Sequence, residues 1–166
     1  MNDEILTLVW FKRDLSVLDH VPLTDAAKIG RVLPVYVIEP EVIEAADFDA
    51  LHWDFIRESL IDLNTSLEEL GVSLFVQIGE VCDVFKRLHQ QFGFTKIFAH
   101  EETGNALSYC RDRRLARWAH SAGVTFKETP QNGVVRRLKD RDGWSKVWES
   151  RMSQPITLPA SKIFGP

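Results

Sequence analysis

The chain has 166 residues, of which 45% are hydrophobic and 27% are charged, and its formal net charge is −4. This length suits one domain with a sizeable core, and the composition excludes an intrinsically disordered chain. The negative net charge argues against a nucleic-acid footprint over the whole chain, because polyphosphate binding depends on basic residues. Any contact with DNA must be local or come from another domain.

The apolar runs of the sequence are too short to cross a membrane. The longest, residues 5–11, has the size of a strand, whereas a bilayer span needs about 20 apolar residues. Residues 1–4 carry two acids where a secretory signal is basic. We therefore expect a cytoplasmic protein with no membrane partner. Cys82 and Cys110 form no disulfide or metal pattern, and we expect both in the core.

Five apolar clusters rich in β-branched residues predict buried strands. The clusters are Ile5–Phe11, Val32–Ile38, Val72–Ile78, Ile97–Ala99 and Val124–Phe126. Each gap between them is long enough for a crossover helix, and strands buried on both faces and joined by helices form parallel sheets. The predicted fold class is α/β: a three-layer, doubly wound, five-stranded parallel sheet of the Rossmann-like type.

Helical periodicity fills the gaps between these clusters. Apolar residues spaced by three and four predict a helix over Trp53–Leu70, with weaker versions over 81–92 and 109–122. Trp53 and Trp118 fall on these stripes and are expected in the core. A glycine closes each helix, where a left-handed conformation lets the chain turn back into the sheet. These glycines are Gly30, Gly71, Gly93 and Gly123.

The regular alternation stops after Pro130. Residues 131–152 are mixed and charged, and the end of the chain carries spaced prolines without helical or strand periodicity. We therefore divide the chain into an α/β domain over residues 1–130 and a connector over residues 131–166. Such a connector favours a chain cut at a domain boundary over a natural disordered tail.

Ligands of open parallel sheets bind beyond the carboxyl ends of the strands, where the strand order reverses. Three loops at these positions are polar: Arg13-Asp14 after the first strand, Glu39 after the second and His100-Glu101-Glu102 after the fourth. Arg13 and Asp14 could contact a heteroaromatic ring, or could cap a helix and pair with each other. The spacing around His100 does not match a zinc helix, so we predict no metal site.

The signatures of common nucleotide enzymes and hydrolases are absent. No Gly-x-Gly-x-x-Gly follows the first strand, and the sequence holds no Walker A run and no Gly-x-Ser-x-Gly. Residues 131–151 carry six basic and three acidic residues, a local balance of +3, with Trp144 and Trp148 between them. This pattern can hold single-stranded nucleic acid, but a connector that folds back onto its own domain has the same pattern, and we favour the connector.

The motif Val9-Trp10-Phe11-Lys12-Arg13-Asp14-Leu15, followed by Asp19-His20 and Leu23, resembles the opening of the DNA photolyase and cryptochrome family. The resemblance continues through residues 33–40, Gly79 and Arg111-Asp112, and ends near residue 130. The pattern is that of the family's N-terminal antenna domain.

The resemblance implies a C-terminal helical domain, absent from this chain, that holds FAD and the damaged DNA. There the excited reduced flavin passes an electron to a pyrimidine dimer, so we expect no catalytic residue in this fragment. The N-terminal domain holds a second, light-harvesting chromophore. The residues that the resemblance implies for its binding are Arg13, Asp14, Tyr36, Glu39 and Glu101.

The identity of this chromophore stays open among a deazaflavin, a flavin and a folate, because Leu107-Ser108 stands where folate-binding members have Asn-Glu. The leading hypothesis is the antenna domain of a deoxyribodipyrimidine photolyase, a lyase whose partners are damaged DNA and its own FAD domain. One alternative is a cryptochrome-like blue-light photoreceptor domain. Another is a stand-alone nucleotide-binding or electron-transfer module, because a fold alone does not fix function.

Overall fold

The computed structural model describes residues 5–46, 48–136, 138 and 140–166. Within these residues, five strands form a parallel sheet in the order β3-β2-β1-β4-β5. The strands are β1 (Leu6–Phe11), β2 (Arg31–Ile38), β3 (Phe75–Ile78), β4 (Lys96–His100) and β5 (Thr125–Thr129). This architecture confirms the predicted doubly wound α/β fold, with helical crossovers between successive strands.

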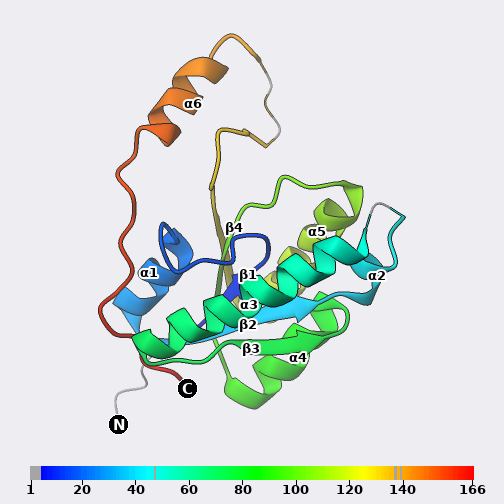
Figure 1. Cartoon of the computed structure of the whole chain (residues 1–166), viewed down its shortest axis with the longest axis vertical. Coiled ribbons are helices and arrows are strands. Elements are labelled where there is room, and N and C mark those ends of the chain that lie inside the picture. The colour runs from blue at the N-terminus through cyan, green and yellow to red at the C-terminus, as the bar shows by residue number, and fades with distance from the viewer. Residues whose placement is uncertain (1–4, 47, 137, 139) are drawn as a thin grey trace.

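Helices cover both faces of the sheet (Figure 1). β1 supplies both cores, because its side chains alternate between the faces. Val9 and Phe11 pack with α1 (Val21–Ile29) and α3 (Ala50–Leu70), whereas Leu8 and Trp10 pack with α4 (Val81–Phe92) and α5 (Ala106–Ser121). The described helices are α1 (Val21–Ile29), α2 (Pro40–Ile43), α3 (Ala50–Leu70), α4 (Val81–Phe92), α5 (Ala106–Ser121) and α6 (Trp144–Met152). None of them is long and apolar enough to cross a membrane.

Glycines end the helices for two different reasons. Gly71, Gly93 and Gly123 have φ values of 103°, 65° and 69°, the left-handed conformation that the sequence predicts. Gly30 does not: its φ of 160° is extended backbone. A Cβ at Gly30 would lie 2.3 Å from the carbonyl oxygen of Ile5, so close backbone packing, and not a left-handed turn, requires glycine there.

The long helix α3 is confirmed, but its predicted apolar stripe is buried only toward its end. Leu63 and Leu67 lie in the core, whereas Trp53 is half-buried and Phe55 is 71% exposed. The prediction that Trp53 is a core residue is therefore wrong, because the first half of α3 lies at the rim of the sheet, where Trp53 lines a small cavity at the end of β2. This half of the helix stands beside the candidate site.

Two further predictions about the core have mixed outcomes. Cys82 is buried as expected, but Cys110 is exposed, because it lies on the outer side of α5. Trp118, on the same helix, is partly buried and packs at the edge of the core beside α4.

The end of the chain contains structure that the sequence did not predict. Residues 144–152 form α6, which stands off from the sheet, and the chain then returns along the domain (Figure 1). Ile163 is 1% exposed in the core under α3, and its N–H donates to the carbonyl of Leu70 at 2.7 Å. The N–H of Val32 donates to the carbonyl of Phe164 at 2.8 Å. The returning segment thus packs into the α/β domain.

Candidate functional site

The strand order reverses between β1 and β4, which lie side by side although six of the described helices and strands separate them along the chain. Two polar clusters occupy the carboxyl ends of these strands and of β2. One is centred on Asp14, immediately after β1, and the other on Arg111, in the first turns of α5. In open parallel sheets this reversal point is the place where ligands bind.

Asp14 is 7% exposed, and its carboxylate faces nitrogen atoms from three segments of the chain. Its Oδ1 accepts the backbone N–H of Lys12 at 2.7 Å, and its Oδ2 lies 2.7 Å from Nδ1 of His100 and 2.9 Å from Nε2 of His20. Burial alone raises the pKa of Asp14, but the hydrogen bonds from His100, His20 and the backbone hold it well below its usual value. The carboxylate is therefore ionised and ties β1, α1 and β4 together.

The geometry of Asp14, His20 and His100 brings three possible metal ligands within 4.8 Å of one another. The hydrogen bonding argues against a metal ion. Nδ1 of His20 accepts the N–H of Leu23 at 3.0 Å as the N-cap of α1, so the neutral imidazole must carry its proton on Nε2. That nitrogen faces Asp14 as a donor and has no lone pair for a metal. The cluster fits a structural junction better than a metal site.

The second cluster is a chain of ion pairs that links the ends of β1, β2 and β4. The guanidinium of Arg111 donates to Glu39 at 2.5 Å and also to Glu102 and Asp112. Nε of Arg13 lies 3.3 Å from Glu102. Arg111 is 5% exposed and stacks over the ring of Trp10, 4.7 Å from its centroid. The cluster therefore joins residues that are far apart in the sequence.

Charges in this cluster balance, because four cations face four carboxylates. Nζ of Lys12 lies 3.3 Å from Asp112, and Arg136 pairs with Glu128 at 2.9 Å. A neutral network of this kind favours a polar, uncharged ring over a polyanion. Its members are Lys12, Arg13, Arg111, Arg136, Glu39, Glu102, Asp112 and Glu128.

Tyr36 lies at the end of β2, close to Glu39, which is a member of this network. Burial, with Glu39 and Glu102 nearby, raises the pKa of Tyr36 to about 12, so its hydroxyl stays protonated at neutral pH. Burial also raises the pKa of Glu39 above its ordinary value, although Arg111 opposes the rise. We call the carboxyl ends of β1, β2 and β4, with the loops that follow them, the rim. At the end of β2 the rim offers a hydroxyl and a carboxyl group, both able to form hydrogen bonds to polar ring atoms.

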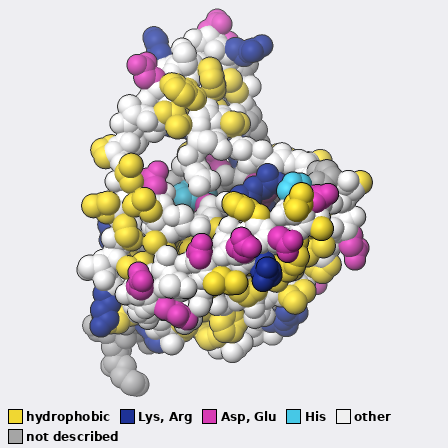
Figure 2. Space-filling view, viewed as in Figure 1, with side chains coloured by type: hydrophobic (Ala, Val, Ile, Leu, Met, Phe, Trp, Pro, Cys, Tyr) yellow, Lys and Arg dark blue, Asp and Glu magenta, His cyan; other side chains and the backbone are white. Residues whose placement is uncertain are grey.

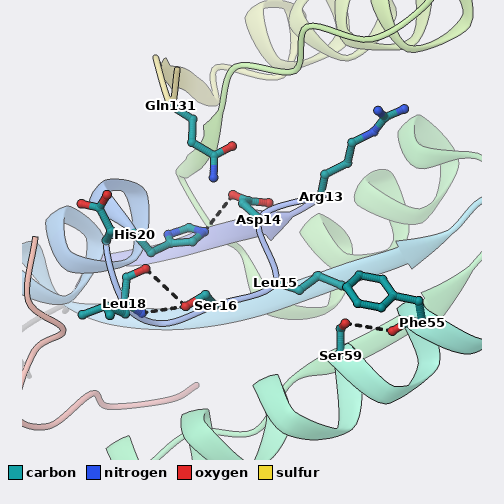
Figure 3. Close-up of a pocket in the computed structure, with 10 residues that line it drawn as sticks. Arg13, Asp14, Leu15, Ser16, Leu18, His20, Phe55, Ser59 and Gln131 are labelled. Carbon is teal, nitrogen blue, oxygen red and sulfur yellow. Dashed lines mark hydrogen bonds and ion pairs between the residues drawn. The ribbon is translucent and has the colours of Figure 1, made fainter. Parts of the chain in front are cut away.

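A cavity of about 310 Å³ opens beside Asp14 and His20 (Figure 3). Gln131 points toward these two residues from above, while Leu15 and Phe55 face each other across the wall near α3. Ligand pockets commonly start at about 300 Å³ and combine apolar walls with a few polar groups. This cavity has that size, but seven of its ten lining residues are polar, and its apolar wall consists of Leu15, Leu18 and Phe55.

The structure brings most of the predicted site residues to one rim. Arg13, Tyr36 and Glu39 meet through the Arg111 network, and Arg13 is a largely exposed cation, with 73% of its side chain accessible. Asp14 instead faces the two histidines. Glu101 lies near Arg136, at the other end of the network. Burial lowers the pKa of Arg136, but the carboxylates of Glu128 and Glu101 raise it, and the result is a pKa above the ordinary value.

Several residues at the rim were not predicted as site residues. Glu102 and Arg111 link the predicted residues, His20 anchors Asp14, and Phe55 lines the cavity. Phe55 gave a signal in the sequence, because it lies two positions after Trp53 and therefore off the core stripe of α3. A large apolar residue off the stripe is expected to face solvent or a ligand.

The fold is an α/β domain whose candidate ligand site lies at the carboxyl ends of the strands of a parallel sheet. The sequence model of the family described as DNA photolyase matches residues 7–142. The chain is 32% identical to the chloroplastic/mitochondrial cryptochrome DASH of Solanum lycopersicum over 164 residues, which are 93% of this chain and 27% of that protein. It is 33% identical to cryptochrome-2 of Gallus gallus over 116 residues, 69% of this chain and 20% of that protein.

The chain belongs to the DNA photolyase and cryptochrome family, as the sequence resemblance predicted. It spans only about a quarter of the length of these relatives. A crystal structure of a bacterial class III photolyase from Agrobacterium tumefaciens aligns with a TM-score of 0.82 at 21% identity, covering 100% of this chain and 36% of the other. An archaeal photolyase from Sulfolobus tokodaii aligns with a TM-score of 0.74 at 22% identity, covering 97% and 37%. At these identities the alignments establish the shared fold.

Proposed function

We propose that this chain is the antenna-chromophore domain of a deoxyribodipyrimidine photolyase. In this proposal the full-length protein holds FAD in a separate C-terminal helical domain and repairs pyrimidine dimers in DNA under light. The observation that carries the proposal is the chain of ion pairs that joins Arg13 to Glu39, with Tyr36 nearby, at the carboxyl edge of the sheet in a chain of this family. The present residues supply binding and leave the repair chemistry to the other domain.

The rim suits a planar heteroaromatic ring. Arg13 supplies exposed donors, Tyr36 a hydroxyl and Glu39 an acceptor, while the exposed ring of Phe55 supplies an apolar wall at the neighbouring cavity. Deazaflavins, flavins and folates all present such rings with polar edges. The Sulfolobus tokodaii photolyase is described as holding two FAD molecules and as implying a novel light-harvesting cofactor, which makes a flavin the first ligand to test here.

Chromophore retention tests the site directly. The purified chain is mixed separately with FAD, FMN, a methenyl folate and a deazaflavin, and absorption is recorded after gel filtration. We expect one of them to be retained and its affinity to fall about tenfold in Arg13→Ala and in Glu39→Gln, which is the loss of roughly one hydrogen bond to a charged group. Lys28→Ala, which removes an exposed cation from α1, serves as the control. Equal retention by all variants would place the site elsewhere.

The enzymatic part of the proposal needs the complete gene product. Light-dependent loss of pyrimidine dimers from irradiated DNA, absent in the dark, supports the photolyase assignment. The second candidate is a cryptochrome-like photoreceptor, favoured by the cryptochrome names of the curated relatives. Flavin binding without repair would support it, and fractionation of the source cells tests the proposed cytoplasmic location.

A further inference from the structure

Charge is distributed unequally between the two faces of the sheet. Helix α3 carries five acidic residues and one arginine, a net charge of −4. On the opposite face, α4 carries two basic residues and one acidic residue, and α5 carries four arginines and one aspartate, so the two helices together have a net charge of +4. Figure 2 shows acidic side chains gathered over α3. The net charge of the whole chain hides this polarity.

The basic residues of α4 and α5 lie on two neighbouring helices of the same layer. The two helices lie side by side, because Arg114 reaches Glu80 at the N-cap of α4 and the ring of His89 packs against Trp118. Five basic side chains of these helices are exposed. We call them the α4–α5 basic face: Lys86, Arg87, Arg113, Arg114 and Arg117.

Part of this basic face is not neutralised by the protein itself. Lys86 pairs with Asp83 and Arg114 with Glu80. Among the described residues, no carboxylate pairs with Arg87, Arg113 or Arg117. Arg113 and Arg117 lie one helical turn apart, where side chains of a helix are neighbours. Arg87, Arg113 and Arg117 are therefore exposed cations of α4 and α5 without a carboxylate partner among the described residues.

Two of the six basic residues of the connector bind groups of the protein itself, while Arg137 and Lys139 lie outside the described residues. Arg136 belongs to the rim network, and Arg151 donates to the backbone carbonyls of Asn132 and Val134. Trp148 packs so closely on Gly133 that a Cβ there would lie 1.9 Å from its ring. These groups stabilise the connector itself.

We propose that the α4–α5 basic face binds the phosphate backbone of duplex DNA, independently of base sequence, light and bound chromophore. Phosphates pair with arginine in bidentate geometry, and repeated phosphates match several cations on one face. The acidic surface of α3 in a second copy of the chain is the other surface with complementary charge. A contact between α3 of one copy and α4–α5 of the next is head-to-tail and does not close, so it predicts open assemblies instead of a defined complex.

Salt-dependent binding of a 20-base-pair undamaged duplex tests the proposal, with fluorescence anisotropy measured in the dark on the chromophore-free chain. If three arginines each contact a phosphate, the logarithm of the association constant should fall against the logarithm of salt with a slope of roughly −3. Arg113→Gln with Arg117→Gln should reduce the magnitude of that slope by about 2. Both side chains are exposed, and thermal unfolding checks that the variant keeps the fold.

The matched control is Arg141→Gln with Lys146→Gln in the connector, because it changes the net charge by the same amount. We expect its slope to equal that of the parent chain.

Three results would overturn the proposal: no binding at 25 mM salt, equal weakening by both double variants, or binding to vesicles of anionic lipid with none to DNA. Formation of large assemblies that the α4–α5 variant abolishes would point to self-association. Each result is independent of whether a chromophore is retained at the rim.

Discussion

Two oxygen atoms of Asp14 hold three segments of the chain in place. Oδ1 fixes the loop after β1 through the N–H of Lys12, and Oδ2 meets the imidazoles of His20 and His100. A buried carboxylate is costly unless donors surround it, and here three donors do so. Arg13, the exposed cation of the rim, is the preceding residue, so the position of Arg13 depends on this junction.

Replacing Asp14 by Asn should lower the stability of the domain by about 3 kcal/mol, because it removes the charge that two buried imidazoles face. The pKa of Asp14 is lower in the folded state than its ordinary value of 3.8, so its stabilising contribution is complete above that value and is lost as the pH falls below it. The difference in the free energy of unfolding between the parent chain and Asp14→Asn should therefore stay constant from pH 5 to 8 and shrink below about pH 4.

Urea unfolding at a series of pH values measures this difference. Asp62→Asn is the matched control, because Asp62 is exposed on α3 and should change stability by less than about 0.5 kcal/mol. A difference that grows as the pH falls would mean that Asp14 is not the ionised acceptor described here.

Rim residues that directly follow a strand could be predicted from the sequence. Arg13 and Glu39 were predictable, because the position of a loop after a buried strand fixes its edge of the sheet. Their partner Arg111 could not be assigned in the same way, because it lies inside a helix whose rotation decides which side chains face the rim. The role of His20 was also hidden, since an N-cap histidine that also faces a buried carboxylate leaves no pattern in the sequence.

At the scale of elements, the returning segment after α6 completes the core. Ile163 is buried between β2 and α3, and the backbone on each side of it bonds to Leu70 and Val32. Arg31 adds a bond from Nε to the carbonyl of Gly165 at 2.7 Å. A segment with these contacts stabilises the domain, although it is distant from it in the sequence.

Ile163→Ala should therefore destabilise the domain by about 3 kcal/mol, the usual range for removing a buried isoleucine side chain. Ile156→Ala provides the control, because Ile156 is 64% exposed in the same segment and should cost less than about 0.5 kcal/mol. The free energies of unfolding in urea give both values. If the two variants were equally stable, the returning segment would contribute nothing to the core.

α6 shows why the end of the chain was harder to predict than the sheet. Four residues of α6 have helical spacing, but three of them are exposed and the fourth, Arg151, is charged. The exposed three are Trp144, Val147 and Trp148. Exposed Trp144 and Trp148 pack on the loop at Gly133 instead of the main core. Periodicity reports burial against a large core, so a helix held by its own loop gives a weak signal.

On the scale of the whole molecule, β1 is the element that both cores share. It pairs with β2 on one side and β4 on the other, and five of its six residues are at most 1% exposed. The edge strand β3 differs, because it pairs with β2 alone and its side chains Val76 and Ile78 are 42% and 67% exposed. Stability should therefore fall from the centre of the sheet toward β3.

Native-state hydrogen exchange should resolve this gradient. Amides of β1 should exchange only through global unfolding, because breaking their bonds exposes both cores, whereas amides of β3 should exchange through local openings of lower free energy. Low denaturant separates the two classes, since exchange by global unfolding accelerates steeply with urea and local opening does not. If β3 amides showed the same opening free energy and urea dependence as β1 amides, the sheet would unfold as one unit and the rim at the end of β2 would be as rigid as the centre. The expected gradient instead leaves the β2–β3 side, which carries Tyr36 and Glu39, free to adjust around a ligand.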